Sequence, residues 1–379
     1  MELRGKNIII VSNEVWGDIW FSKHNYAYEL SKHNNVLFLD PPRRWSPMDL
    51  LRSRIGYTTI SPSLRVLRYT NRIPSLNDRL FELNNTWVSR DIRQRLKTDG
   101  WPVDLFITFD PARLYEPTLL GAGTSLFIAV DAYDGRIRGE RYVFDRVDRI
   151  VTISEQISKD LVHYGKPLLT ISHAISSEEF EAPFQAMPQH EFGLYVGTLD
   201  KRVDIGLLKE ITEAHPEVPF LLIGRFALRG VEEAERLIQG GRHGNVHYLG
   251  VLPFKELKAY IAASRFCISP MDFTWPGNDI SHHKIFQYLA FGKPVFCNIF
   301  TEYIPIGHLL YMRNDRQELL TDLAHFLANG ESRSLATDRI EHARTKTYEV
   351  ILRRIEEFLE GTTHGVSDGP SNAILDQRG

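Results

Sequence analysis

Short apolar runs that recur between helical stretches constrain the fold of this 379-residue chain more than any other feature. Runs such as "NIIIVS" (7–12), "VDLFITF" (103–109) and "FGLYVG" (192–197) are apolar without alternation, which is typical of strands covered on both faces. Stretches with helical periodicity lie between them, and this alternation predicts an α/β fold built on parallel sheets. The predicted strands cover residues 7–12, 36–40, 103–109, 125–131, 149–154, 168–174, 192–197, 218–224, 246–250, 265–270, 294–299 and 309–312.

A polar segment, Ser176–Glu191, divides these predicted strands into two series. The segment contains two prolines, so we expect a linker there. We predict an N-terminal Rossmann-like domain at residues 1–180 and a C-terminal one at 181–343, each with a doubly wound sheet. An amphipathic stretch at 344–361 predicts a closing helix, and the polar, glycine-rich stretch 362–379 predicts a disordered tail. Because ligands bind beyond the carboxyl ends of strands in such sheets, two facing domains would form a cleft.

The charge of the chain is unevenly distributed. A net charge of −3 gives no global reason for nucleic-acid binding, so we expect no nucleic-acid partner. Residues 42–97 differ from the rest, because they hold twelve Lys/Arg against four Asp/Glu. This segment is either a solvated surface or a docking face for anionic lipid or a phosphorylated acceptor.

Cysteine usage and hydropathy bear on the compartment. Cys267 and Cys297 each lie in an apolar run that predicts a buried strand, which favours a reducing compartment over a disulfide scaffold. The run Ile8–Val11 is too short for the core of a signal peptide, and no window approaches about 18 apolar residues. We therefore expect a cytoplasmic protein, peripheral at the inner face of the plasma membrane if the basic segment docks on lipid.

Several nucleotide- and metal-binding motifs are missing from the chain. Both Gly-Lys pairs (165–166 and 292–293) run into proline, so neither belongs to a P-loop. "SNEVWGDIW" follows the first predicted strand with a single glycine, which argues against a dinucleotide fingerprint. No Cys/His cluster has zinc spacing, and we expect neither a metal nor another cofactor. P-loop enzymes, protein kinases and ordinary dehydrogenases are therefore disfavoured.

The stretch "NDISHHKIFQYLAFGKPV" (278–295) predicts a helix that begins with basic residues. His282, His283 and Lys284 crowd its first turn, where the helix dipole disfavours cations. A helix start that carries a lysine is suited to an anion such as a diphosphate, and the two histidines would either help to hold phosphate or a sugar carboxylate or be solvated. Gln287, one turn further on, offers a donor and an acceptor to sugar hydroxyls. The alternative is a solvated first turn with a structural Gln287.

Several of these stretches resemble one enzyme family. "KIFQYLAFGKPV" resembles the C-domain signature of two-domain GT-B glycosyltransferases, and "YVGTLDKRVD" (195–204) resembles their first C-domain strand and phosphate-binding turn. "NVHYLGVLPFKELKAYIAASRFCISP" and "DRIVTISEQISKDL" are similar to the middle of their nucleotide domain and to the last N-domain strand and helix. The resemblance covers most of residues 7–360. It implies a GT-B fold, in which two Rossmann-like domains face each other across a cleft and a C-terminal helix packs back, and it implies a nucleotide-sugar donor.

One departure from the family pattern bears on the mechanism. The retaining branch usually has two glutamates spaced E-x7-E around this helix, where the present chain has Asp279 and Gln287. A lysine followed three residues later by glutamine is similar to inverting β-glucuronosyltransferases of exopolysaccharide assembly. That similarity implies Asp131, at the end of the predicted strand in "LFIAVDAYDG", as the general base. Lys284, Arg202 and the helix start would then stabilise the departing diphosphate without a metal. The alternatives are that Asp131 caps the following segment and that Arg202 is an ordinary surface residue.

Other positions are predicted to contribute to the donor site. Gly197 and Thr198 occupy the turn where the backbone would approach phosphate. Gly17, after the first strand, would let the backbone close on the donor, or else forms a plain turn. Arg225 would contact the donor or lie on the surface. Phe273 would offer a stacking face to the base, or else pack structurally.

The hypothesis that follows is a glycosyltransferase. It would move a sugar from a nucleotide diphosphate donor, a UDP-sugar such as UDP-glucuronate, to a lipid-linked or polysaccharide acceptor with inversion at the anomeric carbon. The segment 42–97 would form the acceptor side and make peripheral contact with an anionic membrane. Two alternatives remain: a retaining transferase of the same fold, and a non-catalytic nucleotide-sugar-binding or scaffold protein.

Overall fold

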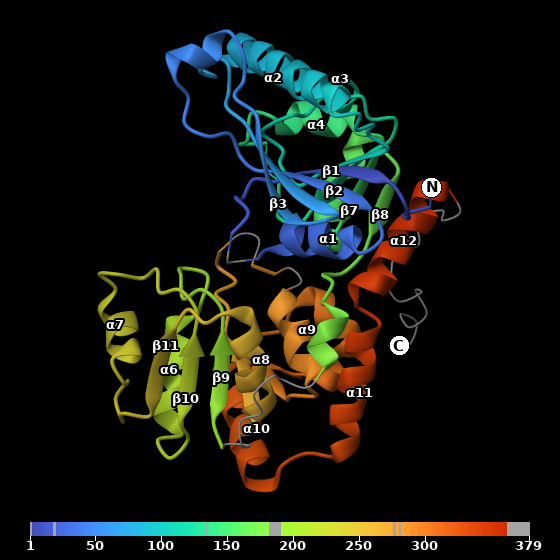
Figure 1. Ribbon diagram of the computed structural model, residues 1–379. Coiled ribbons are helices and arrows are strands. Elements are labelled where there is room, and N and C mark those ends of the chain that lie inside the picture. The colour runs from blue at the N-terminus through green and yellow to red at the C-terminus, as the bar shows by residue number, and fades with distance from the viewer. Residues whose placement is uncertain are drawn as a thin grey trace, which may run out of the picture. The chain divides into compact units, whose positions relative to one another are not determined.

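The computed structural model describes residues 2–17, 20–133, 135–181, 191–275, 278–279 and 282–361. The chain forms two compact units, and the first contains both the blue-to-green N-terminal part of the chain and the red helix α12 in Figure 1. One unit comprises the residues up to Ser172 together with helix α12 (Tyr348–Glu360), and the other runs from His173 to Thr347. The short helix η3 (Ser177–Phe180), assigned to the N-terminal domain in the sequence analysis, thus groups with the second unit. The predicted tail, 362–379, lies outside the described residues.

The first unit is built on an eight-stranded sheet with the order β3-β4-β2-β1-β5-β6-β7-β8. All neighbouring strands are parallel except the β3–β4 pair, which is antiparallel. The chain moves outwards from β1 through β2 to β4 and then returns to β5 beside β1, so the topological switch lies between β1 and β5. The strands are β1 (Asn7–Val11), β2 (Asn35–Leu39), β3 (Gly56–Ser61), β4 (Leu64–Arg68), β5 (Leu105–Thr108), β6 (Ser125–Ala129), β7 (Arg149–Thr152) and β8 (Leu168–Thr170).

Helices cover this sheet and bury its apolar strands. Val88 and Ile92 of α2 are fully buried in one cluster with Ile9, Leu37 and Phe106 from three strands. Helix α12 packs against α1 (Figure 1), and Arg354 donates a hydrogen bond to the carbonyl of Thr170, the last residue of β8. The helices of this unit are α1 (Ser22–Ser31), η1 (Pro47–Leu50), α2 (Asp78–Thr98), α3 (Pro117–Leu120), α4 (Glu140–Arg146), α5 (Glu155–Leu161), η2 (Val162–Tyr164) and α12.

The second unit is built on a six-stranded parallel sheet with the order β11-β10-β9-β12-β13-β14. Its switch point lies between β9 and β12, because β10 and β11 extend to one side and β13 and β14 to the other. The strands are β9 (Gly193–Val196), β10 (Phe220–Ile223), β11 (Val246–Gly250), β12 (Phe266–Ser269), β13 (Val295–Cys297) and β14 (Tyr311–Met312). The helices are η3, α6 (Ile205–Ala214), α7 (Glu232–Ile238), α8 (Phe254–Ala263), α9 (His283–Ala290), η4 (Thr301–Leu309), α10 (Arg316–Asn329) and α11 (Arg333–Arg344).

Cysteine placement and hydropathy agree with the sequence. Cys267 and Cys297 are fully buried in β12 and β13, and both are free thiols, as predicted. Within the described ranges, no helix is both long and apolar enough to cross a bilayer.

Helix α9 is the element predicted to hold an anion. Its apolar residues Ile285 and Leu289 are fully buried, and it ends before Gly292, whose φ of +66° suits glycine. His282 is the N-cap residue, but its side chain makes no capping hydrogen bond. Asp279, the nearest preceding carboxylate, does not cap the helix either, because it accepts hydrogen bonds from the backbone N–H and the hydroxyl of Thr301. Four N–H groups at the start of a helix lack intrahelical partners, so this end is able to receive an anion.

Candidate active site

The loops that follow β9 and β10 meet at two glycines. Gly197 and Gly224 have φ values of +145° and +144°, and a Cβ atom on Gly224 would lie 2.0 Å from the carbonyl oxygen of Gly197. No side chain fits between these two segments of backbone, so position 224 requires glycine. The hydroxyl of Tyr195 donates to the carbonyl of Thr198 over 3.1 Å and fixes the turn after β9. The predicted phosphate turn is therefore a closely packed backbone corner.

Arg202 is held by its backbone to the loop after β12, across the switch point. Its carbonyl accepts hydrogen bonds from the backbone N–H of Asp272 (2.8 Å) and from the side-chain amide of buried Asn278 (3.0 Å). The guanidinium pairs with Asp200 at 2.8 Å, yet 55% of the Arg202 side chain remains exposed. The structure thus fixes the origin of this side chain and leaves its charged end close to water.

Lys284, in the first turn of α9, projects to the same corner. Its amine lies 4.6 Å from the ring centroid of Tyr195, 3.9 Å from the sulfur of Met271 and 3.6 Å from the place of a Cβ on Gly197. No carboxylate of the described residues forms an ion pair with it. Burial, and then the neighbouring charge of Arg202, lowers the pKa of Lys284 to about 8. A desolvated amine with weak partners, beside a glycine turn and a helix start, is a strong candidate for an anion site.

The two histidines beside Lys284 do not add positive charge. Burial lowers the pKa of His282 to about 3 and that of His283 to about 4, so both rings are neutral at neutral pH. One ring nitrogen of His282 lies 3.1 Å from the carbonyl of Asn278, and its backbone N–H donates to the hydroxyl of Tyr303. Burial lowers the pKa of all three basic residues that the sequence places here, but the pKa of Lys284 starts from 10.5 and stays near 8, so Lys284 alone carries a charge at neutral pH.

Gln287 lies one turn further along α9 and is buried. Its side-chain amide donates a 2.9 Å hydrogen bond to Glu179, a fully buried residue of η3. The other carboxylate oxygen of Glu179 is buried, and no residue that the structure describes forms a hydrogen bond with it. Glu179 lies 108 residues from Gln287 in the chain, and the sequence contains no local signal of this contact.

The buried contact between Glu179 and Gln287 predicts how the stability of the protein depends on pH. Burial raises the pKa of Glu179 from 4.5 to about 7, against the opposing effects of Gln287 and Lys258. The folded unit therefore binds the carboxyl proton of Glu179 more tightly than the unfolded chain does. The stability that this bound proton contributes is lost as the pH rises from about 4.5 through about 7. One pKa unit corresponds to about 1.4 kcal/mol, so about 3 kcal/mol is involved. Glu179→Gln should raise the thermal midpoint at about pH 8.5 and change it little at about pH 5.

Thermal unfolding of both proteins across this pH range, followed by circular dichroism, checks the prediction. Glu181→Gln, an exposed neighbour, is the matched control and should keep the wild-type pH slope. Equal pH slopes for wild type and Glu179→Gln would contradict the assignment of the buried proton to Glu179.

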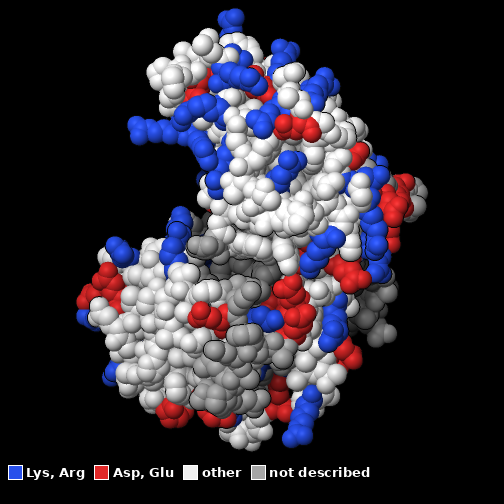
Figure 2. Space-filling model, in the orientation of Figure 1, with Lys and Arg blue, Asp and Glu red and all other residues white. Residues whose placement is uncertain are grey.

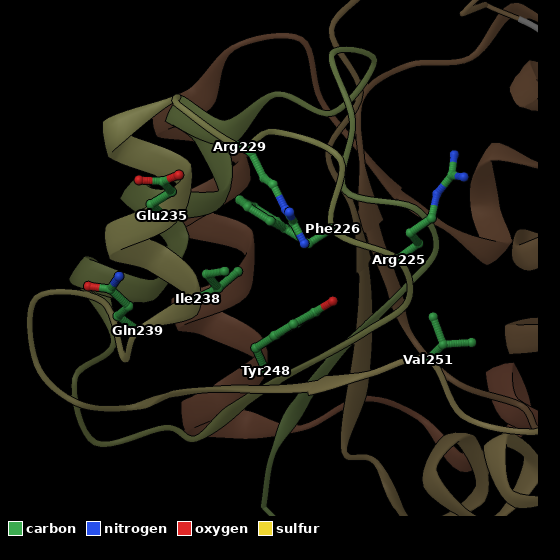
Figure 3. Close-up of a pocket in the computed structure, with 8 residues that line it drawn as sticks. All are labelled: Arg225, Phe226, Arg229, Glu235, Ile238, Gln239, Tyr248 and Val251. Atoms are coloured by element: carbon green, nitrogen blue, oxygen red, sulfur yellow. The ribbon is translucent and has the colours of Figure 1, made fainter.

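A hollow of about 590 Å³ opens on the second unit (Figure 3). The hydroxyl of Tyr248 donates to the carbonyl of Gly224 over 2.9 Å, which connects the hollow to the corner. Arg229 and Tyr248 point toward one another in Figure 3, whereas Arg225 points away. The lining residues are Arg225, Phe226, Arg229, Glu235, Ile238, Gln239, Tyr248 and Val251.

Phe273, which we predicted as a stacking face, does not line this hollow. Its ring packs edge-on against Phe300 at 5.0 Å and joins the core cluster that includes α9. Phe226 and Tyr248, missed by sequence reasoning, supply aromatic surface at the hollow instead. The sequence points to these two aromatic residues only through their positions, because Phe226 follows β10 and Tyr248 lies within β11.

Asp131 is exposed two residues beyond the end of β6, at the carboxyl edge of the first sheet. Buried Lys23, from the first turn of α1, donates a 2.6 Å hydrogen bond to the side chain of Asn13. Burial lowers the pKa of Lys23, while the carboxylates of Asp131, Glu14 and Asp110 oppose that change. Asp131 thus belongs to a charged group at the switch between β1 and β5 that the sequence did not reveal.

Gly17 lies in the loop after β1 on the same edge. It is exposed, and a Cβ added there would contact nothing within 4 Å. The neighbouring Trp16 anchors the loop, because its backbone N–H donates to Asp40 over 2.8 Å. Among the described residues, therefore, no close neighbour requires a glycine at position 17.

Comparison with known proteins gives one curated relative. No protein-family model matches the chain. A putative teichuronic acid biosynthesis glycosyltransferase, TuaH from Bacillus subtilis (strain 168), is 25% identical over 167 residues. The match spans 41% of this chain and 41% of the length of that relative.

Solved structures match almost the whole chain. Sucrose-phosphate synthase from Thermosynechococcus elongatus has a TM-score of 0.63 at 16% identity, over 94% of this chain and 99% of that one. The catalytic domain of starch synthase IV from Arabidopsis thaliana, bound to ADP and acarbose, has a TM-score of 0.66 at 11% identity, over 94% and 99%. The chain has the GT-B fold. A UDP-forming α,α-trehalose-phosphate synthase from Burkholderia vietnamiensis agrees, with a TM-score of 0.65 at 12% identity over 94% and 100%. The predicted fold is therefore confirmed.

Proposed function

We propose that the protein is a glycosyltransferase that uses a nucleoside diphosphate sugar as donor. Lys284 carries this proposal, because its amine lies at the start of α9 and beside Gly197 with no carboxylate partner among the described residues. In a doubly wound sheet the switch point is the usual ligand position. The likeness to TuaH and to the sugar-phosphate and starch synthases supports the same class of reaction.

The donor is placed along the second unit by three neighbouring features. The diphosphate is held by the turn at Gly197 and Thr198, by Lys284 and by Arg202, which replace the charge that a metal would supply. The nucleoside extends towards the hollow, where Tyr248 and Phe226 offer aromatic surface. We propose UDP as the nucleotide, in line with the UDP-forming neighbour. We propose glucuronate as the sugar from the spacing of Lys284 and Gln287, which is similar to that of inverting β-glucuronosyltransferases.

Asp131 of the first unit acts as general base in this proposal. It takes the proton of the acceptor hydroxyl while the hydroxyl oxygen attacks C1 of the donor from the face opposite the diphosphate. The C1–O bond to the diphosphate breaks, and Lys284 and Arg202 stabilise the charge on the leaving group. The sugar is transferred with inversion to a lipid-linked or polysaccharide acceptor, and the basic segment 42–97 faces the membrane that carries it.

Turnover of sugar nucleotides tests this function. Purified protein is incubated with UDP-glucuronate, UDP-glucose, UDP-N-acetylglucosamine or GDP-mannose and a bacterial envelope lipid extract, and the release of nucleoside diphosphate is measured. We expect release from one UDP-sugar, accelerated by the extract. Binding of nucleotide without release from any donor would favour a non-catalytic binding protein instead.

A further inference from the structure

The loop between β2 and β3 presents apolar side chains to water. Met48, Leu50 and Leu51, in and beside η1, are 75%, 48% and 86% exposed. Single exposed apolar side chains are common, but three within four residues at one turn form a patch. We call residues 42–55, which carry this patch, the η1 loop.

Hydrogen bonds to buried side chains and to the neighbouring elements fix the conformation of the η1 loop. Asp49 is fully buried and accepts hydrogen bonds from the backbone N–H of Ser46 (2.7 Å) and from the hydroxyl of Thr70 (2.9 Å). The backbone N–H of Ser53 donates to Asp91 of α2 over 2.8 Å, and Arg72 donates to the carbonyl of Leu50 over 2.9 Å. These bonds hold the turn while its apolar side chains point outwards, so the exposure is fixed by the fold.

Positive charge surrounds the exposed apolar side chains. Arg43, Arg44 and Arg52 are exposed, and none of them forms an ion pair with a described residue. The single carboxylate of the η1 loop, Asp49, is buried and paired with Arg54. Figure 2 shows the wider setting, with Lys and Arg side chains gathered over the end of this unit that carries α2. The η1 loop therefore has an apolar tip with a positively charged rim.

We propose that the η1 loop docks this protein on the surface of an anionic lipid bilayer. Met48, Leu50 and Leu51 enter the boundary between headgroups and acyl chains, and the three unpaired arginines contact lipid phosphates. Arginine suits this position because its aliphatic stem lies along apolar surface while its charge stays at the phosphates. The inference rests on the proposed function in one respect: the bilayer is the source of the lipid-linked acceptor.

Co-sedimentation of the full-length protein with vesicles tests the proposal. We expect binding to vesicles of phosphatidylcholine with phosphatidylglycerol and little binding to phosphatidylcholine alone, because the arginine rim requires anionic headgroups. Leu51→Glu should weaken the partition coefficient by about tenfold or more, because a leucine no longer leaves water. Arg43→Gln, Arg44→Gln and Arg52→Gln together should weaken it by about a hundredfold.

Val162→Glu is the matched control, because Val162 is 65% exposed in the same unit but lies outside the η1 loop. It should bind vesicles like wild type, and thermal unfolding of each variant confirms that it is folded. Absence of wild-type binding to anionic vesicles, or unchanged binding by Leu51→Glu, would overturn the proposal. A dimer that Leu51→Glu converts to monomer, without vesicle binding, would assign the patch to a second copy of the chain. Titration with UDP separates membrane docking from the proposed donor site. Leu51→Glu should bind UDP like wild type, and UDP binding by a wild-type protein that binds no vesicles would overturn the docking proposal alone.

Discussion

Asp131→Asn should lower the turnover number for sugar transfer by about 10²- to 10⁴-fold, the usual contribution of a positioned base. The asparagine keeps the size of the side chain but no longer accepts the proton of the acceptor hydroxyl. Donor binding should stay near the wild-type value, since the proposed donor contacts lie in the other unit. The release of nucleoside diphosphate under saturating donor and acceptor measures the first quantity, and calorimetric titration with the nucleotide measures the second.

Asp160→Asn is a suitable control for this experiment, because Asp160 is exposed on α5 in the same unit, away from the β6 edge. Its turnover should match that of wild type. A fully active Asp131→Asn protein would show that another group accepts the proton or that the reaction needs no base at this position.

Lys284→Met should weaken donor binding by about ten- to a hundredfold, the usual value of a hydrogen bond to a charged group. Methionine preserves most of the apolar contact with Tyr195 and Met271 while it removes the charge. The Michaelis constant for the sugar nucleotide is the measured quantity. Because burial lowers the pKa of Lys284 to about 8, wild-type affinity should also fall as the pH rises above about 8, where the amine loses its proton.

Lys209→Met is the matched control, because Lys209 is an exposed lysine of the same unit that pairs with Glu233. It should leave the Michaelis constant and its pH dependence unchanged. If Lys284→Met has the wild-type constant across this pH range, the diphosphate is bound elsewhere.

The fold could be predicted from the sequence because its central strands are buried on both faces. Continuous apolar runs such as those of β1 and β9 indicate such strands without any long-range information. The edge strand β3 and its neighbour β4 were not predicted: "GYTTIS" and "LRVLR" mix polar and apolar residues, and both strands keep partly exposed positions.

The candidate site was less predictable, because its decisive properties arise from tertiary contacts. The sequence places three basic residues at the start of α9, but burial leaves His282 and His283 neutral and Lys284 charged. The partner of Gln287, Glu179, comes from a polar segment with no periodic signal. Lys23 likewise lies in a helix whose sequence gives no sign that its amine is buried near Asp131.

Calorimetric titration of the wild-type protein with UDP, UMP and uridine tests whether the start of α9 binds a diphosphate, because these ligands differ only in phosphate. UDP should bind most tightly, with each lost phosphate weakening affinity by about tenfold or more as contacts with Lys284 and the start of α9 disappear. Equal affinity for UDP and uridine, or no binding of UDP by the folded protein, would contradict a diphosphate site at this helix.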